Sequence, residues 1–164
     1  MTRIGLLSDT HGYLPESVFT HFADVDEIWH AGDIGDVSTS NRLETFKPFR
    51  AVYGNIDGHE LRARYPEHLS FTLEGVPVLM THIGGYPPRY NKTILPYLNQ
   101  CKPHLFICGH SHILKVIPDA TRQLLHINPG ACGKQGWHKV STLVRFGVAD
   151  GRVHDLEVIE LGKR

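Results

Sequence analysis

Leu105-Phe-Ile-Cys-Gly-His-Ser-His112 is a short apolar run that ends in a glycine and two histidines. An apolar run of this length is typical of a buried strand, and the glycine allows a sharp turn at its end. We therefore expect His110 and His112 at a strand terminus, where open α/β sheets place their chemistry. Two nearby histidines are also typical of an ordinary polar loop, so they indicate a metal site only if other strand ends supply matching ligands.

Four earlier strand ends supply such residues. In each, a compact apolar run stops at a side chain with an oxygen or nitrogen ligand atom. The residues concerned are Asp9 with His11, Asp33, Asn55 and His82. The alternative for Asp9 and Asp33 is that each caps a helix, but the Asp-x-His and Gly-Asp patterns in successive units favour ligands. We expect His30, within a strand, to be a core histidine or to support the site, and Asp36 and Asp57 to support it from the surrounding loops.

The order of the elements predicts the fold. The first two runs are followed by residues at helical spacing, which gives two β-to-α units. Residues 70–82 are typical of a hairpin, and only strands are expected after Ile113, the last two joined through Asp150-Gly151. Early β-to-α units and late antiparallel strands predict a mixed α/β (α+β) architecture, with two packed sheets and helices on their outer faces. We expect residues 1–164 to form one domain.

Two local predictions concern the connections. Residues 38–41 are expected to cap a helix that carries Leu43 and Phe46, with Asn41 and Glu44 as a capping box. Residues 83–90, rich in glycine and proline, are expected to form a loop, with a helix beyond it.

Composition narrows the function. The 17 basic and 17 acidic residues cancel, which argues against a strong nucleic-acid-binding surface. The three cysteines have no metal-binding or disulfide spacing, so they are read as reduced thiols, and no segment has the features of a signal peptide or a membrane span. These features predict a soluble cytoplasmic protein. Twelve histidines are unusual and favour a metal site.

The polar side chains at strand ends form a set of seven. They are Asp9, His11, Asp33, Asn55, His82, His110 and His112. One tetrahedral zinc needs only four ligands, so seven suit two divalent ions that share a carboxylate. Such a pair activates water and clamps both oxygens of an in-line phosphoryl displacement, which indicates phosphoester hydrolysis.

The order of these motifs resembles that of the calcineurin-like metallophosphoesterase superfamily, especially its small single-domain phosphodiesterase branch. The resemblance implies a four-layer αββα sandwich, with two mixed β-sheets flanked by helices, and a binuclear centre. By that analogy Asp9, His11 and His112 hold one metal, Asn55, His82 and His110 hold the other, and Asp33 bridges both. Asp9, Asp33, Asn55 and His82 would then act in catalysis through a metal-activated hydroxide. Asn128-Pro-Gly130 also resembles a motif of this branch that lies near the site.

One position departs from the wider superfamily. Many members carry histidine directly after the Gly-Asn pair, as an acid for the leaving group or a clamp on phosphate, and this chain has Ile56. Isoleucine can do neither, so we expect a preference for phosphodiesters or aryl phosphates with acidic leaving groups. His59 is the candidate for a substitute acid, and its alternative role is that of a surface residue at a helix start.

Substrate contacts are expected from Asn55 and from the loop after His82. Tyr86 and Tyr90 offer aromatic faces and Arg89 a guanidinium, although the same residues would suit a plain solvated loop. Manganese is the first choice of metal, and zinc, iron, nickel or cobalt also suit mixed oxygen and imidazole ligands.

The sequence therefore predicts an enzyme, a metal-dependent phosphodiesterase acting on aryl or nucleotide-like diesters with broad specificity. Its partners would be a small phosphoester substrate and two divalent metal ions per chain, without a membrane and with a homo-oligomer allowed. The alternatives are a phosphomonoesterase or protein phosphatase of the same superfamily, and a non-catalytic scaffold on the same fold.

Overall fold

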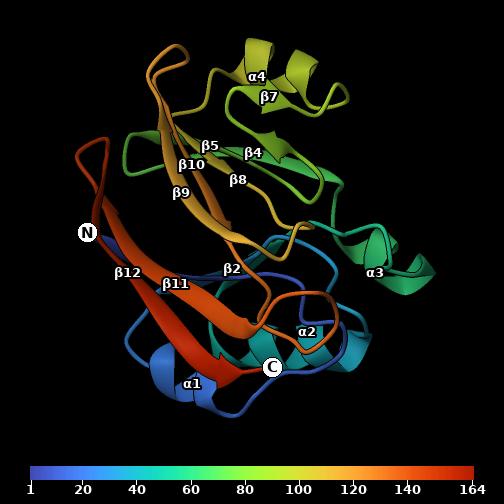
Figure 1. Cartoon of the computed structure of the whole chain (residues 1–164). Coiled ribbons are helices and arrows are strands. Elements are labelled where there is room, and N and C mark those ends of the chain that lie inside the picture. Colours follow the sequence, from blue (N-terminus) through green and yellow to red (C-terminus); the bar gives the residue numbers. More distant parts are fainter.

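The computed structural model describes residues 1–164, which form two five-stranded mixed sheets and a two-stranded hairpin (Figure 1). The first sheet has the strand order β12-β11-β1-β2-β3, and the second has the order β4-β5-β8-β10-β9. Strands β1, β2 and β3 are parallel to one another, as are β5, β8 and β10. The first sheet consists of β1 (Thr2–Leu7), β2 (Glu27–His30), β3 (Phe49–Ala51), β11 (Val140–Ala149) and β12 (Arg152–Lys163). The second consists of β4 (His68–Leu73), β5 (Val76–Thr81), β8 (Leu105–Ile107), β9 (Leu114–Asp119) and β10 (Leu124–Pro129).

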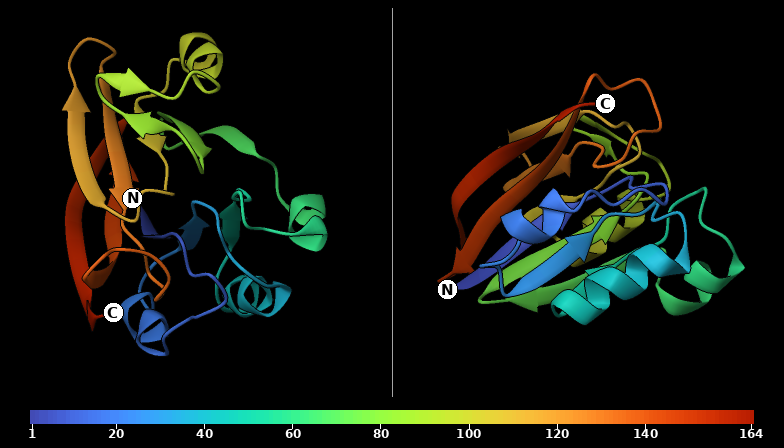
Figure 2. Two further views of the ribbon diagram at one scale, coloured as in Figure 1. Left: turned by 45° about the vertical axis from the view of Figure 1, so that its right-hand side comes forward. Right: turned by 90° about the horizontal axis from the view of Figure 1, so that it is seen from below.

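Helices cover the outer faces of the two sheets. In Figure 1 and in the left view of Figure 2, α1 (Ser17–His21) and α2 (Val37–Phe46) lie on one side of the molecule and α4 (Leu95–Cys101) on the opposite side. The short helix α3 (His59–Arg64) stands at the margin, after β3. This arrangement confirms the predicted αββα layers. None of the helices has both the length and the apolar character needed to cross a bilayer.

Strand β1 shows why the first sheet is buried on both faces. Successive side chains of a strand point to opposite faces. Leu6 lies in the core of 14 buried residues between the sheets, and its neighbour Leu7 lies in a second core with Val18 and Phe22 of the α1 region. An uninterrupted apolar run is therefore needed here, and it carries the chain to Asp9 at the edge where the polar side chains gather.

The start of α2 differs from the prediction. The N-cap is Asp36, whose side chain accepts a hydrogen bond from the Thr39 backbone N–H at 2.8 Å, so the proposed capping box of Asn41 and Glu44 is wrong. Ser40 lies inside the helix, where its hydroxyl donates to the Val37 carbonyl. Because a Ser, Thr or Asn side chain can serve equally as cap or as interior residue, composition alone misplaced the boundary.

Turns confirm the two predicted hairpins and add a third. Glu74-Gly75 joins β4 to β5 and Asp150-Gly151 joins β11 to β12, in each case with two positive φ angles as a two-residue type I′ turn requires. The loop after His82 contains a small hairpin that the sequence did not predict, formed by β6 (Gly85–Tyr86) and β7 (Arg89–Tyr90).

Candidate metal centre

The seven predicted ligand residues all follow strands whose carboxyl ends meet at one edge of the sandwich. Strands β1, β2 and β3 carry Asp9, His11, Asp33 and Asn55 on the loops that follow them, and β5 and β8 carry the remaining histidines. Parallel strands end on the same side, so five separate loops meet there. The structure brings all seven side chains into one connected group.

Asp9, His11 and His112 form the first cluster of metal-ligating atoms. Their ligand atoms all lie within 4.8 Å of one another. The Nε2 atoms of His112 and His11 lie 3.2 and 3.7 Å from Asp9 Oδ1. A carboxylate oxygen with imidazole nitrogens on its open side is a donor set for a divalent transition metal.

Asp33, His82 and His110 form the second cluster, under the same 4.8 Å limit. Asn55 joins it because its side-chain Oδ1 lies 3.1 Å from His110 Nδ1. His110 and His112 thus belong to different clusters although only Ser111 separates them, as predicted from the two-metal analogy. The turn at residues 110–112 therefore contributes one histidine to each cluster.

Asp33, a member of the second cluster, also contacts the first. Its Oδ2 atom is 3.1 Å from His82 Nε2 and 3.4 Å from His11 Nε2, one residue from each cluster. Its other oxygen, Oδ1, accepts a hydrogen bond from the Ile56 backbone N–H at 3.0 Å. That bond fixes the carboxylate so that Oδ2 faces both sets of imidazoles, which is the geometry of a bridging ligand.

Asp9 shows the same division between its two oxygens. Oδ2 accepts from the Ser8 hydroxyl at 2.5 Å and from the His110 backbone N–H at 3.1 Å. Oδ1 is buried and has no hydrogen-bond partner in the chain. A buried carboxylate oxygen without a partner is costly, so its surroundings are built for a cation.

The ring nitrogens of two histidines also suit a bound metal ion. Nε2 of His11 and Nε2 of His82 are also buried and without hydrogen-bond partners. His82 Nδ1 lies 2.8 Å from the Ala31 carbonyl oxygen, to which only an N–H can donate, so in the neutral ring Nε2 carries a lone pair. His82 Nε2 faces Asp33 Oδ2 at 3.1 Å, a contact that needs a positive charge, either a proton on the ring or a cation held between the two atoms. The residues present therefore fit divalent metal ions.

The electrostatics keep the carboxylates charged. Burial alone would raise the pKa of Asp9, but its contacts with His11 and His112 outweigh burial and hold that pKa far below its ordinary value. The pKa of Asp33 is lowered in the same way, with burial opposed by His82. Burial lowers the pKa of His82, but the two aspartates more than offset it and the net shift is upward. The centre thus offers two anionic carboxylates to a cation.

The backbone at the centre is strained. Asp9, His11, Asp33, His110 and His112 all have φ between 49° and 72°, the left-handed region that side chains other than glycine rarely adopt. Each such residue costs on the order of 1 kcal/mol, and this strain concentrates at functional sites. Five of the seven predicted ligands share it, as do five residues in turns and strands elsewhere in the chain.

Asp57 clamps the loops that carry Asp33 and Asn55. Its buried carboxylate accepts backbone N–H bonds from Gly54 at 2.8 Å, Gly35 at 2.9 Å and Ile34 at 3.2 Å. These donors belong to the loops after β2 and β3, so a single side chain ties two ligand-bearing loops together. The prediction that Asp57 supports the site is consistent with this geometry, and Asp36 serves α2 instead.

We expect Asp57→Asn to lower the free energy of unfolding by about 3 kcal/mol, because an amide nitrogen would face a backbone donor that now has an acceptor. Urea denaturation of the metal-free chain measures this loss. Asp24→Asn, at an exposed aspartate without a side-chain partner, is the control. Equal midpoints for the two variants would show that Asp57 does not hold the loops.

Two further polar groups position the ligand loops. His30 is fully buried, accepts the Gly32 backbone N–H on Nδ1 at 3.1 Å, and contacts the Thr10 hydroxyl through Nε2 at 3.0 Å. Asn128 donates from Nδ2 to the Gly109 carbonyl and to the Ser111 hydroxyl. His30 therefore fixes the residues around Asp9 and Asp33, and Asn128 fixes the turn that carries His110 and His112, which explains the Asn-Pro-Gly motif.

The other predicted site residues lie elsewhere. His59 begins α3 and lines a shallow depression with Gly35, Asp36 and Glu60, apart from the two clusters. The structure does not bring it together with the ligands, so its role as a proton donor stays a prediction without geometric support.

The three predicted substrate contacts in the loop after His82 lie in different surroundings. Tyr86 and Arg89 line a cavity that also contains His110. Tyr90 lines the same cavity, but its hydroxyl donates to Asp119 Oδ2 at 2.5 Å and its ring packs on Phe106. Tyr90 therefore anchors the loop to β9, whereas Tyr86 is 46% exposed and Arg89 is exposed as well. Contact of any of the three with substrate stays a prediction.

The chain matches a known protein family over most of its length. Residues 2–151 match the model of the calcineurin-like phosphoesterase superfamily domain. The chain belongs to this superfamily. A relative from Methanothermobacter thermautotrophicus, named a "probable metallophosphoesterase", is 32% identical over 97% of this chain and 92% of its own length. Membership makes the chain a metallophosphoesterase by family, in a fold that uses divalent metals, and the two clusters are its candidate metal-binding sites.

Solved structures support the same fold. An archaeal phosphodiesterase superimposes with a TM-score of 0.78 at 22% identity, covering 98% of this chain and 100% of that one. Vps29 from Chaetomium thermophilum superimposes with a TM-score of 0.76 at 14% identity, and each chain is fully covered. At these identities the likeness shows the fold alone. The predicted superfamily and the predicted sandwich are both confirmed.

Proposed function

We propose that this metallophosphoesterase is a phosphodiesterase that works with two divalent ions, one in each cluster. The observation that carries the proposal is Asp33 Oδ2, which faces His11 of one cluster and His82 of the other at 3.4 and 3.1 Å. A carboxylate shared in this way is the arrangement that two neighbouring ions require. The name of the structurally similar archaeal phosphodiesterase supports the same reading.

The side chains of the centre have separable tasks. Asp9, His11 and His112 would hold one ion, Asn55, His82 and His110 the other, and Asp33 both. Bound ions of this kind lower the pKa of water, so that hydroxide is available near neutral pH, and stabilise the charge of the transition state. The Ala31 carbonyl keeps His82 in the tautomer that binds through Nε2. The Ile56 N–H keeps Asp33 oriented, so the protein supplies a rigid frame for in-line attack.

The surroundings favour a diester over a monoester. A monoester carries an additional negative charge, and a phosphatase needs a further cation or donor to bind it. The residue after Asn55 is Ile56, which offers neither. Arg62 directs Nε to the Asp57 carbonyl and Nη2 to the Asn55 carbonyl, so these bonds hold the loop. A monoanionic diester matches this supply of charge better.

An apolar rim supports aryl ester groups. Ile56, Ile83 and Ile113 directly follow the ligand residues Asn55, His82 and His112, and they are 46%, 37% and 56% exposed. Exposed isoleucines gathered beside a polar centre offer contact area to an apolar group. We therefore propose that the site accepts aryl or other apolar groups on the phosphate, in line with broad specificity.

Manganese is the proposed metal. Two carboxylates, one amide oxygen and four imidazoles form a mixed donor set without cysteine, which suits manganese and also admits zinc, iron, nickel or cobalt. Activity after chelation and reconstitution with each metal in turn decides among them.

The substrate class is tested with matched p-nitrophenyl esters. Reconstituted with Mn²⁺, the chain is expected to hydrolyse bis-p-nitrophenyl phosphate with a kcat/KM at least about tenfold above that for p-nitrophenyl phosphate, because Ile56 supplies no donor or charge for the additional negative charge of the monoester. Bulk release of p-nitrophenolate measures both. A higher kcat/KM for the monoester would favour the phosphatase alternative.

The missing donor at Ile56 gives a second expected result. A general acid is typically worth roughly 10²- to 10⁴-fold, and its absence leaves the rate dependent on the basicity of the departing oxygen. Rates for a series of aryl and alkyl methyl phosphodiesters should fall steeply as the pKa of the leaving alcohol rises. A flat series would mean that another side chain donates the proton, and His59→Ala in that series would show whether His59 is the donor.

A non-catalytic scaffold is the second candidate function, favoured by the likeness to Vps29. Against it, the chain retains side chains with ligand atoms at all seven positions and places them together. If the metal-loaded chain hydrolyses neither ester faster than metal alone, the scaffold is the better account.

A further inference from the structure

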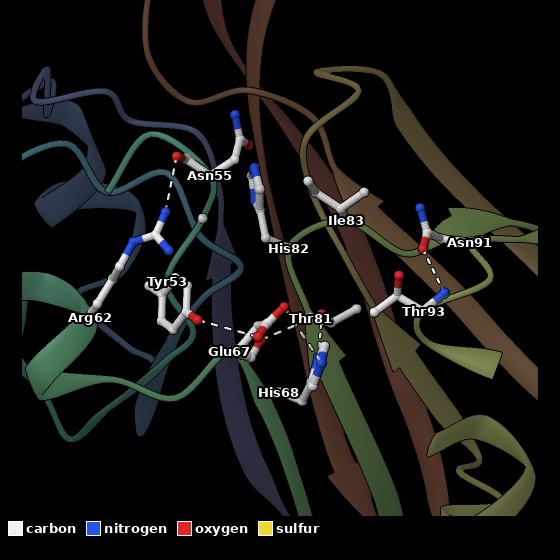
Figure 3. Close-up of a pocket in the computed structure, with 11 residues that line it drawn as sticks. Tyr53, Asn55, Arg62, Glu67, His68, Thr81, His82, Ile83, Asn91 and Thr93 are labelled. Atoms are coloured by element: carbon white, nitrogen blue, oxygen red, sulfur yellow. Dashed lines mark hydrogen bonds and ion pairs between the residues drawn. The ribbon is translucent and has the colours of Figure 1, made fainter. Parts of the chain in front are cut away.

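A polar cavity opens beside the second cluster. It has a volume of about 320 Å³, at the lower end of the range of roughly 300–1,000 Å³ for small-molecule sites, so it holds one compact group rather than a polymer. Asn55 and His82 form its upper end in Figure 3. A phosphate at the metal centre would therefore have one ester group directed at this cavity.

The walls of the cavity carry balanced charge. Figure 3 shows Tyr53 and Arg62 on one side, Asn91 and Thr93 on the other, and Glu67 between them. Apart from groups at the metal centre, the formally charged side chains of the lining are one arginine and one glutamate. A second phosphate would meet no net positive charge, so the cavity suits a neutral group.

Several polar groups of the lining can still donate or accept hydrogen bonds. Asn91 Oδ1 accepts the Thr93 backbone N–H at 2.9 Å, which leaves the Asn91 amide NH₂ as a donor, and the Thr93 hydroxyl has no side-chain bond in the chain. Glu67 Oε2 accepts the Tyr53 hydroxyl at a long 3.3 Å. A carboxylate has about four acceptor positions, so Glu67 can accept further hydroxyl groups.

The floor between these walls is preorganised. The Thr81 hydroxyl shares a hydrogen bond of 2.8 Å with His68 Nδ1 and lies 3.5 Å from the Glu67 backbone carbonyl. The His68 ring also packs on the Tyr97 ring, with centroids 4.4 Å apart. These contacts hold the His68 ring and the backbone at Glu67 in place before a ligand arrives, which lowers the cost of binding.

We propose that this cavity is a ribonucleoside subsite, which takes one ester group of the phosphodiester and gives the enzyme its substrate class. A carboxylate that accepts ribose hydroxyls is a recurrent means of binding ribose, and Glu67 supplies it. Asn91 and Thr93 offer donors to the carbonyl oxygens of a base. A lipid or plain aryl group would make no use of these hydrogen-bonding groups. The inference rests on the proposed diesterase activity.

The test uses four diesters that share p-nitrophenol as leaving group and differ in the other ester group, which is uridine (5′-linked), 2′-deoxyuridine (5′-linked), phenyl or methyl. With the Mn²⁺-loaded chain, kcat/KM is expected to be at least tenfold higher for the uridine ester than for the phenyl and methyl esters. The deoxyuridine ester should lie about fivefold below the uridine ester, because it lacks one hydroxyl for Glu67.

Variants locate the effect. Glu67→Gln should reduce the uridine-to-deoxyuridine ratio toward one, and Thr93→Val should reduce the uridine-to-methyl ratio several-fold. Glu160→Gln and Thr121→Val replace exposed residues of the same types outside the cavity and should change neither ratio.

The possible outcomes distinguish a failure of the ribonucleoside subsite from a failure of the proposed diesterase activity. Hydrolysis of all four esters at similar kcat/KM overturns the subsite and leaves the diesterase standing. Absence of any hydrolysis overturns the proposed function, and calorimetric titration with uridine 5′-monophosphate and methyl phosphate then tests the subsite by itself. Tighter binding of the uridine compound, weakened by Glu67→Gln, supports the subsite, and equal binding of both compounds overturns it.

Discussion

Asp33→Asn is expected to reduce Mn²⁺-dependent kcat/KM on bis-p-nitrophenyl phosphate by roughly 10³-fold or more, since it removes the anionic ligand on which both metal positions depend. The substitution is nearly isosteric. The asparagine Oδ1 can still accept the Ile56 N–H, whereas an NH₂ group would replace the Oδ2 atom that faces His11 and His82. The loss should therefore arise from the metal centre and not from the fold.

Two measurements accompany the rate. Circular dichroism should show an unchanged fold, because the carboxylate oxygen that bonds the backbone is retained as an amide oxygen. Asp24→Asn makes the same chemical change at an exposed position and should keep full activity. Activity of Asp33→Asn within tenfold of the parent chain would mean that Asp33 does not bridge two ions.

His110→Ala and His112→Ala are each expected to lose a different metal ion. The two residues belong to separate clusters, His112 with Asp9 and His11, and His110 with Asp33 and His82. Each variant should keep about one Mn²⁺ per chain under conditions that saturate both positions in the parent, with the other position weakened by at least about 100-fold. Titration calorimetry reports both the stoichiometry and the affinities.

A double-variant cycle identifies which ion is lost. Asn55 lies 3.1 Å from His110 and far along the chain from it, so Asn55→Ala should add little to His110→Ala but should remove the remaining ion from His112→Ala. Equal loss of both ions in the two single variants would contradict the assignment of one histidine to each position.

The sequence singled out the candidate ligands because each one lies at or just after the end of an apolar strand. A strand buried on both faces must be largely apolar, so the polar residues that follow it mark the sheet edge, as Ser8 and Asp9 do after β1 and His82 does after β5. The convergence of five such ends follows from parallel strands. The layered fold was predictable for the same reason, with hairpins marked by Glu74-Gly75 and Asp150-Gly151.

The supporting contacts were less accessible to sequence reasoning because they join distant residues. The Asp57 carboxylate accepts hydrogen bonds from the backbone N–H groups of Ile34 and Gly35, which are 23 and 22 positions away in the sequence. The residues next to Asp57 in the sequence do not indicate these partners. The left-handed backbone of the ligand residues is likewise set by the surrounding fold. The cavity beside Asn55 depends on residues from several separate segments, and only the structure shows that Glu67, Asn91 and Thr93 face one space.

The start of α2 illustrates a different limit. Asp36, Ser38, Ser40 and Asn41 all have side chains that can cap a helix, and the choice among them depends on which backbone N–H groups lie within reach in the folded chain. In the folded chain the Asp36 side chain accepts a hydrogen bond from the Thr39 backbone N–H at 2.8 Å, so Asp36 is the N-cap. Such boundaries are decided by a competition among similar residues, which composition does not resolve.

The most direct test of the binuclear centre is an anomalous difference map from crystals of the chain grown with Mn²⁺ and measured on both sides of the manganese absorption edge. We predict two peaks roughly 3.5–4 Å apart, the usual spacing of paired catalytic ions. One should lie among Asp9, His11 and His112, the other among Asn55, His82 and His110, with Asp33 in contact with both. A single peak, or two peaks without Asp33 between them, would contradict the account.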